Sequence, residues 1–178
     1  DAPVSGGPKG AASGKHGLQA TRLAVLRNLS VEDMGKFLDI AAGRLAKVNI
    51  LNATTSRDKL FEKPLIHPRK QVGFLNMTSS LISELDTNVG PYMERLLDAV
   101  LYCLVFACRQ LQGTTIEDDA PLPEDEDLAS TQSLLKVARS TGIKCLIMLF
   151  QNAQSFDWEA YKGIIIEEVV APRLDAFS

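Results

Sequence analysis

Few residues of this chain could do chemistry, and the most informative are four basic side chains close together in sequence: Lys63, His67, Arg69 and Lys70. Pro68 is expected to begin a helix, because a proline at the first helical position loses no hydrogen bond. Arg69 and Lys70 would then lie in the first turn, where the helix dipole disfavours cations by about 0.3–1 kcal/mol each. A solvated basic surface is the plainer interpretation. Contact with the phosphates of RNA or with an acidic protein segment is the alternative.

Other residue types that support catalysis or metal binding lack partners at a useful spacing. Neither of the two histidines, His16 and His67, has a second histidine or a cysteine pair at the spacing of a zinc site. No sequence feature marks a nucleophilic serine on a sharp turn, and no glycine-rich loop follows a strand. The three cysteines fall in apolar helical patterns, which indicates buried structural thiols. We therefore expect a protein that is not an enzyme and binds no cofactor, metal or small-molecule substrate.

Composition is that of a soluble, helical protein. Hydrophobic residues make up 46% and aromatic residues 6% of the 178 residues, and leucine occurs 24 times, which favours packed helices over sheets. The net charge of −3 argues against a basic nucleic-acid-binding domain. The longest apolar run, Ala99–Cys108, is about half as long as the roughly 20 residues of a membrane helix, so we expect a buried helix and no membrane partner. Since the chain begins at Asp1 and not at methionine, we expect a piece of a longer protein.

Charge and glycine content divide the chain into segments. Residues 113–127 hold seven acidic residues and no lysine or arginine, which predicts a disordered, solvated insertion loop. The rest of the chain therefore carries a net charge of +4, all of it in residues 1–112. Residues 1–17 hold five glycines and two prolines and are expected to be flexible. Residues 18–112 and 128–178 remain as the helical parts.

Apolar residues recur with the 3.6-residue helical period over most of these parts. Ser30 is expected to cap the second helix, and Pro91 to open the helix that contains the long apolar run. Residues 49–66 show no clean period and predict a connection with a loose turn around Phe61. Gly142 is expected to interrupt or bend its helix. The sequence predicts helices over residues 18–29, 31–48, 68–86, 91–111, 129–152 and 156–172.

Six helices joined by two long loops predict an all-α fold of three antiparallel helix pairs. The clearest pair, residues 68–111, has the length of one HEAT or armadillo repeat, which predicts a HEAT/armadillo-like α-solenoid fragment. A four-helix bundle with extra helices is the alternative. We favour the solenoid because residues 91–111 are apolar on too many faces for a helix at an edge.

Four short stretches together resemble a known family. They are RKQVGFLN at residues 69–76, STGIK at 140–144, DWEAY at 157–161 and VAPRL at 170–174. In this order and spacing they resemble the down-regulated-in-metastasis family, also described as the U-three small nucleolar RNA-associated protein twenty family. The resemblance covers roughly residues 60–178 and leaves out the acidic and glycine-rich segments.

The resemblance implies a non-catalytic HEAT-repeat scaffold of the small-subunit processome in the nucleolus of the nucleus. Its implied partners are ribosome assembly factors, the U-three snoRNP, and the pre-rRNA and snoRNA of a large ribonucleoprotein. It implies a role in ribosome biogenesis through processing of the small-subunit rRNA precursor, and it supplies no site residues. The alternative is a HEAT/armadillo adaptor that binds peptides in transport or signalling. Against this adaptor, the chain holds one tryptophan and no repeated ladder of asparagines and tryptophans.

Overall fold

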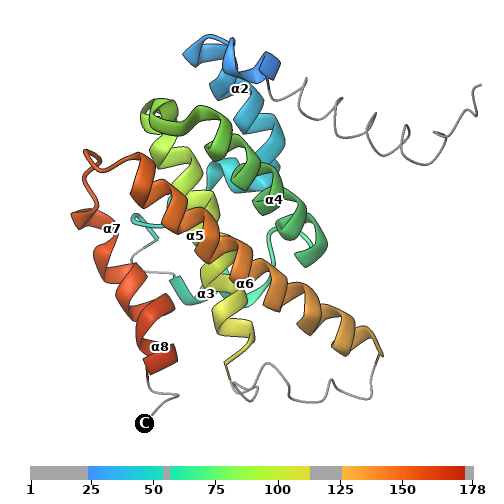
Figure 1. The fold of residues 1–178 in the computed structure, drawn as a ribbon. Helices are drawn as coiled ribbons and strands as arrows, with labels where there is room; N and C mark the ends of the chain where they lie inside the picture. Colours follow the sequence, from blue (N-terminus) through green and yellow to red (C-terminus); the bar gives the residue numbers. More distant parts are fainter. Residues whose placement is uncertain (1–23, 54–56, 113–125, 175–178) are drawn as a thin grey trace, which may run out of the picture.

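The computed structural model describes residues 24–53, 57–112 and 126–174, and all regular structure within these ranges is helical (Figure 1). The predicted all-α fold class is therefore confirmed. The predicted flexible segment 1–17 and nearly all of the predicted acidic loop lie outside the described residues.

A short helical turn at residues 24–27 precedes the labelled elements. The α-helices are α2 (Val31–Ala42), α3 (Arg57–Glu62), α4 (Pro68–Leu85), α5 (Met93–Gln110), α6 (Glu126–Asn152), α7 (Glu159–Ile164) and α8 (Ala171–Leu174). Two 3₁₀ helices, η1 (Gly43–Lys47) and η2 (Asp86–Tyr92), follow α2 and α4, and a π-helical stretch, η3 (Ile165–Val170), joins α7 to α8.

The central helix is α5, in which 14 of 18 residues are buried. It contacts η1, α3, α4, η2, α6 and η3, so the long apolar run predicted to be a buried helix is covered on all sides. None of the described helices is both long and apolar enough to cross a membrane. The long helix α6 crosses α5 and runs alongside α4 (Figure 1), and it packs on each of them more extensively than they pack on each other. The predicted helix pair of residues 68–111 is thus held together largely through α6.

Two helix starts form as their local sequence predicts. The Ser30 hydroxyl accepts a hydrogen bond from the Asp33 backbone N–H at 3.1 Å, which caps α2. Pro68 occupies the first turn of α4, where its missing N–H costs no hydrogen bond. His67 caps the same helix, because its Nδ1 accepts from the Arg69 backbone N–H at 3.2 Å.

The second predicted helix ends six residues early, because the chain turns at Gly43. This residue has φ of +55°, a conformation that glycine adopts without the strain of a side chain. The chain continues as η1, which turns Arg44 and Lys47 away from the direction of α2. The predicted loose turn around Phe61 is also wrong, since residues 57–62 form α3 and Phe61 is buried against Tyr102.

Three further predicted boundaries are wrong. Pro91 lies inside η2, so α5 begins at Met93, and α6 begins at Glu126. The last helix continues past Pro172, which lies in α8. A proline has no N–H to donate to the carbonyl four residues back. The wider π-helical turns of η3, in which the Ala171 N–H donates to the Ile166 carbonyl, come directly before this proline.

Gly142 does not interrupt α6. A Cβ atom added there would lie 3.2 Å from the Cβ of Leu104 on α5. The glycine therefore allows α5 and α6 to approach closely. Its role is in the packing of these two helices, and it does not bend α6.

Candidate functional site

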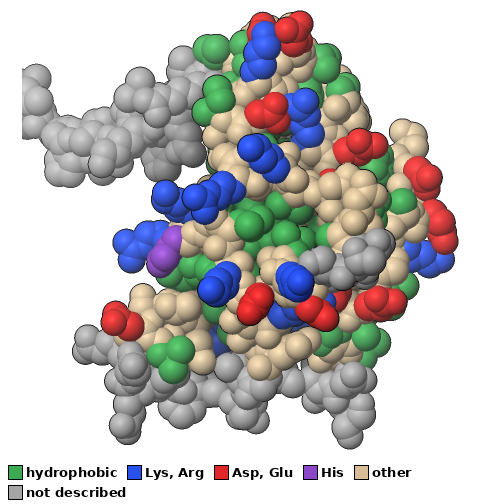
Figure 2. Space-filling model, turned by 180° about the vertical axis from the view of Figure 1, so that it is seen from behind, with side chains coloured by type: hydrophobic (Ala, Val, Ile, Leu, Met, Phe, Trp, Pro, Cys, Tyr) green, Lys and Arg blue, Asp and Glu red, His purple; other side chains and the backbone are tan. Residues whose placement is uncertain are grey.

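The four basic residues singled out in the sequence are all exposed, but they do not share one hollow. Lys63 follows α3, whereas His67, Arg69 and Lys70 surround the start of α4. Figure 2 shows the histidine of the described residues beside lysine and arginine side chains, with hydrophobic side chains at the centre of the same face. This face is the part of the molecule in which the predicted basic group lies.

Two adjoining hollows on the surface, with volumes of about 770 and 820 Å³, carry cations at their edges. Both are lined by Gly43, Arg44 and Leu65, so we treat them as one surface, the basic groove. Its cationic side chains are Arg44, Lys47 and Lys70, and His67 lines it as well. Arg69 and Lys63 do not line it.

The cations of this face have no carboxylate partners among the described residues. None of Arg44, Lys47, Lys63, His67, Arg69 and Lys70 takes part in an ion pair in the described part of the chain, and no aspartate or glutamate lines the groove. Unpaired cations of one sign, gathered around a concavity, focus a positive potential that attracts anions.

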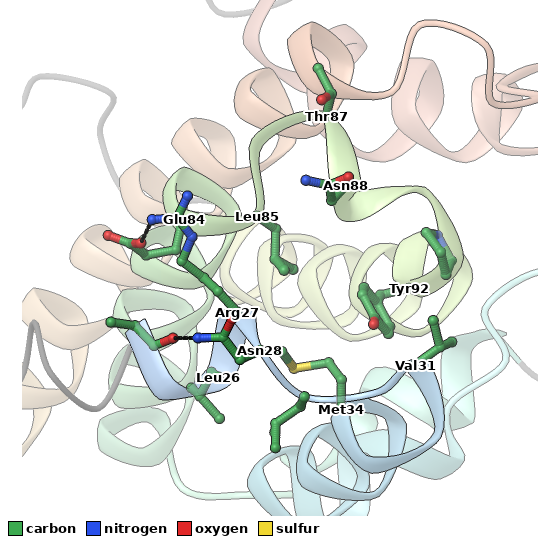
Figure 3. A pocket seen from close by; sticks show the side chains of 13 residues that line it. Leu26, Arg27, Asn28, Val31, Met34, Glu84, Leu85, Thr87, Asn88 and Tyr92 are labelled. Atoms are coloured by element: carbon green, nitrogen blue, oxygen red, sulfur yellow. Dashed lines mark hydrogen bonds and ion pairs between the residues drawn. The ribbon is translucent and has the colours of Figure 1, made fainter.

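Another hollow lies between residues 24–34 and the junction of α4 with η2 (Figure 3), and the cation that lines it has a carboxylate partner. Its arginine, Arg27, is paired with Glu84 at 3.4 Å, and the Asn28 side chain donates to the Ala24 carbonyl at 3.0 Å. The charge of this arginine is already balanced within the chain, so the basic groove is the better candidate for an anionic partner.

Helix α5 holds both walls of the basic groove from beneath. The backbone N–H of Leu65 donates to the hydroxyl of buried Tyr102 at 2.9 Å. Gln71, also buried, donates to the neighbouring carbonyl of Ile66 at 3.0 Å. On the other wall, the Asp98 carboxylate accepts from the backbone N–H of Ile50, close to groove residues 47–49. Because residues 98 and 102 are one helical turn apart, a single face of α5 fixes both walls.

Asp98 is a buried carboxylate on α5 with a raised pKa. It is only 9% exposed, and burial raises its pKa to about 6, although the hydroxyl of Tyr161 and the N–H of Ile50 donate to it. The same burial, together with the charge of Asp98, raises the pKa of Tyr161. Its second oxygen, Oδ1, is buried without a hydrogen-bond partner in the described part of the chain. Asp98 thus ties α5 to α7 and to the loop at residue 50.

The remaining ionisable and nucleophilic groups serve packing. Burial raises the pKa of all three cysteine thiols, that of Cys145 to about 11, so none of them is a ready nucleophile. The predicted buried thiols are confirmed. The guanidinium of Arg109 binds Glu168 through two nitrogen atoms and Asp58 through another, and it lies over the ring of Phe61. No group of three side chains suited to a metal occurs among the described residues.

Arg44 and Lys47 are the groove residues that sequence reasoning missed. Both fall inside the single helix predicted over residues 31–48, and nothing in the sequence pattern places them beside His67 and Lys70. The signal that could have found them is Gly43, since glycine is the residue that most often ends a helix.

The chain matches a family model described as U3 small nucleolar RNA-associated protein 20, N-terminal, over residues 5–178. It is 26% identical over 162 residues to the U3 small nucleolar RNA-associated protein 20 of Schizosaccharomyces pombe. It is 28% identical over 157 residues to the protein of the same name from Saccharomyces cerevisiae. These alignments cover 90% and 88% of this chain but only 6% of each relative. The chain therefore corresponds to a small part of these proteins.

Proposed function

The chain belongs to the U3 small nucleolar RNA-associated protein 20, N-terminal, family, and we propose that it is a segment of a non-catalytic scaffold in the small-subunit processome. The match over residues 5–178 is the observation that carries the proposal. Both relatives are named for their association with the U3 small nucleolar RNA. The proposal extends that association to the protein of which this chain is a part.

In this proposal the protein acts in the nucleolus, with the U3 snoRNP, during processing of the small-subunit rRNA precursor. It acts by binding other components and not by catalysis. Two features of the structure support this role. First, polar pairs between helices join them to one another, namely Asp98 with Tyr161 and Arg109 with Glu168. The surface also carries lysine and arginine side chains on one face (Figure 2), and Arg44, Lys47 and Lys70 among them form no ion pair within the described residues.

We place the contact with a polyanion of the processome on the basic face, which consists of the basic groove and the basic residues beside it. Arg44, Lys47 and Lys70 at the groove, with Lys63 and Arg69 beside it, supply cations that are exposed and not ion-paired within the described residues, and His67 lines the groove with them. Binding to phosphates or to clustered carboxylates is driven in large part by such cations and weakens as salt is added.

We also propose that the predicted division of the chain reflects repeats. Residues 18–112 and 128–178 would be helical repeats, and the acidic residues 113–127 would join them. The packing of α6 on both α4 and α5 is consistent with adjacent repeats that share one core.

The experiment that tests the function is purification of the tagged full-length parent protein, followed by sequencing of the RNA that accompanies it. We expect strong enrichment of the U3 snoRNA and of the small-subunit rRNA precursor over a mock purification. RNA no richer than in the mock purification would overturn the proposal and would favour a peptide-binding adaptor.

Charge reversal in the same parent protein tests the basic face. Arg69→Glu with Lys70→Glu should lower the recovery of both RNAs severalfold, because two attractive charges become repulsive. Lys144→Glu with Lys162→Glu is the matched control, since it changes the net charge equally at exposed positions of α6 and α7. Equal recovery from both double variants would remove the basic face from the proposal and leave the scaffold role intact.

A further inference from the structure

We propose that the basic groove binds an acidic segment of a partner protein, whose apolar side chains enter the groove while its carboxylates meet the surrounding cations. The inference rests on the proposed function, in which this face contacts a polyanion, and it names the chemical class of that partner.

The floor of the groove is aliphatic. Leu60, Leu65, Ile66 and Met77 line it, and each is half-buried, packed against the core and still partly open to solvent. Covering such side chains gains free energy in proportion to the apolar area removed from water. A phosphate backbone cannot cover them, because its surface is polar and charged. Apolar side chains of a protein segment can.

The cations at the edges of the groove favour a partner that carries negative charge. Arg44 and Lys70 line the hollow next to α4, and Lys47 extends the positive charge along η1. No acidic residue lines either hollow to balance them. Complementary charge at the rim of an interface directs partner choice and speeds association, whereas the covered apolar floor contributes most of the affinity.

The floor does not suit bases of single-stranded RNA. Proteins bind unpaired bases by stacking them on exposed aromatic rings or arginine planes. Among the lining residues, the ring of Phe74 is only 7% exposed and belongs to the core, so the exposed groups able to stack on a base are Arg44 and His67, and the floor between them is aliphatic. The observations therefore favour a protein segment over RNA.

The walls are held in place before any partner binds. Tyr102 holds the backbone of Leu65, and Asp98 holds that of Ile50, both from the buried helix α5. A groove with fixed walls loses less conformational entropy on binding than one that must be ordered by its partner.

Gly73 offers a way to fill the groove without changing its charge. It lines the hollow, it is exposed, and a Cβ atom added there would meet no atom within 4 Å. Gly163 on α7 is also exposed, and its added Cβ would meet no atom within 4 Å, but it does not line the groove. Gly73→Gln and Gly163→Gln are therefore matched variants, of which only the first obstructs the proposed site.

The test measures binding of the 178-residue chain to fluorescein-labelled probes by fluorescence anisotropy. One probe is a short peptide of glutamate and serine with two leucines one helical turn apart. A second replaces both leucines by serine, and a third is a single-stranded RNA of equal charge. We expect the leucine peptide to bind at least about tenfold more tightly than the serine peptide, since burying one leucine is worth more than a tenfold change in Kd.

The variants locate this binding. Gly73→Gln should weaken the leucine peptide about tenfold and Gly163→Gln should leave it unchanged, because only the first side chain fills the groove. Arg44→Gln with Lys70→Gln should weaken it more than Lys144→Gln with Lys162→Gln.

Equal binding of the leucine and serine peptides would overturn the inference. So would binding of the RNA that is tighter than that of the leucine peptide and equally sensitive to Gly73→Gln, which would make the groove an RNA site. These outcomes are independent of the RNA recovered with the parent protein, so the inference and the proposed function can fail separately.

Discussion

Asp98 and Tyr102 stand one helical turn apart on α5, and each is bonded to a backbone N–H of a different groove wall. Neither side chain lines the groove. Their effect on it is indirect, because a hydrogen bond from a loop to a buried partner restricts where the loop can lie. At the scale of single residues, the surface is thus set by polar groups in the interior as well as by the cations that a partner would meet.

Burial of Asp98 predicts a pH dependence of stability. Its pKa is about 6 in the folded chain and 3.8 in its ordinary environment, so the folded chain holds the proton more tightly. The stability that this proton confers is complete below pH 3.8 and is lost as the pH rises to about 6. The free energy of unfolding should therefore fall by about 3 kcal/mol over this range from this group.

The measurement is urea unfolding of the chain at several pH values, with Asp98→Asn for comparison. Asparagine is neutral throughout and its side-chain oxygen can accept from the same two donors. The variant should therefore lack the fall between about pH 4 and 6. A pH dependence equally steep in both proteins would contradict the assignment to Asp98.

At the scale of the elements, α2 and α4 begin where short-range signals predict, and α5 and α6 pack closely where a glycine permits. Ser30 and Pro68 act within one turn of their own positions, so their effect is readable from neighbouring residues. Gly73 and Gly142 both lie inside long helices, yet their surroundings are opposite. A Cβ atom added at Gly73 would face open space, whereas one added at Gly142 would lie 3.2 Å from Leu104 on α5.

Substitution of these two glycines should change stability in opposite directions. Gly73→Ala should raise the free energy of unfolding by about 1 kcal/mol, because alanine favours a helix and nothing opposes its methyl group. Gly142→Val should lower it by about 2 kcal/mol, since the added atoms would force α5 and α6 apart. Urea unfolding at one pH measures both. Changes of the same sign would show that helix propensity, and not contact with Leu104, governs position 142.

At the scale of the whole molecule, contacts between distant segments decide how the helices assemble. Arg109 on α5 joins Asp58 of α3 to Glu168 of η3, and it covers the ring of Phe61. The side chain of Glu168 is only 14% exposed, so its carboxylate depends on this partner. The cation therefore connects three segments that lie far apart in the sequence.

Removal of the Arg109 side chain should lower the free energy of unfolding, and the size of this loss should depend on Glu168. Arg109→Leu should destabilise the chain by about 3 kcal/mol, because it leaves the largely buried Glu168 carboxylate unpaired. In the presence of Glu168→Gln the same change should cost at least about 1 kcal/mol less. Urea unfolding of the four proteins of this double-mutant cycle gives the coupling. Strictly additive effects would mean that the two side chains do not support one another.

The sequence by itself determined the family and the fold class. Four stretches in order matched the family that the comparison over residues 5–178 then established, and the helical period predicted an all-α fold. It also determined the caps at Ser30 and Pro68 and the buried state of the cysteines. These properties depend on residues a few positions apart, or on how apolar a stretch is, and both can be read along the chain.

Only the tertiary structure decided what the basic residues form together. The turn at Gly43 brings Arg44 and Lys47 to the same groove as His67 and Lys70, while Arg69 lies outside it. The anchors of that groove come from residues 98 and 102, more than 30 positions beyond the backbone groups of Ile50 and Leu65 that they bind. Which of many loop conformations is stable depends on packing between segments distant in sequence. No local pattern of residue types records that packing.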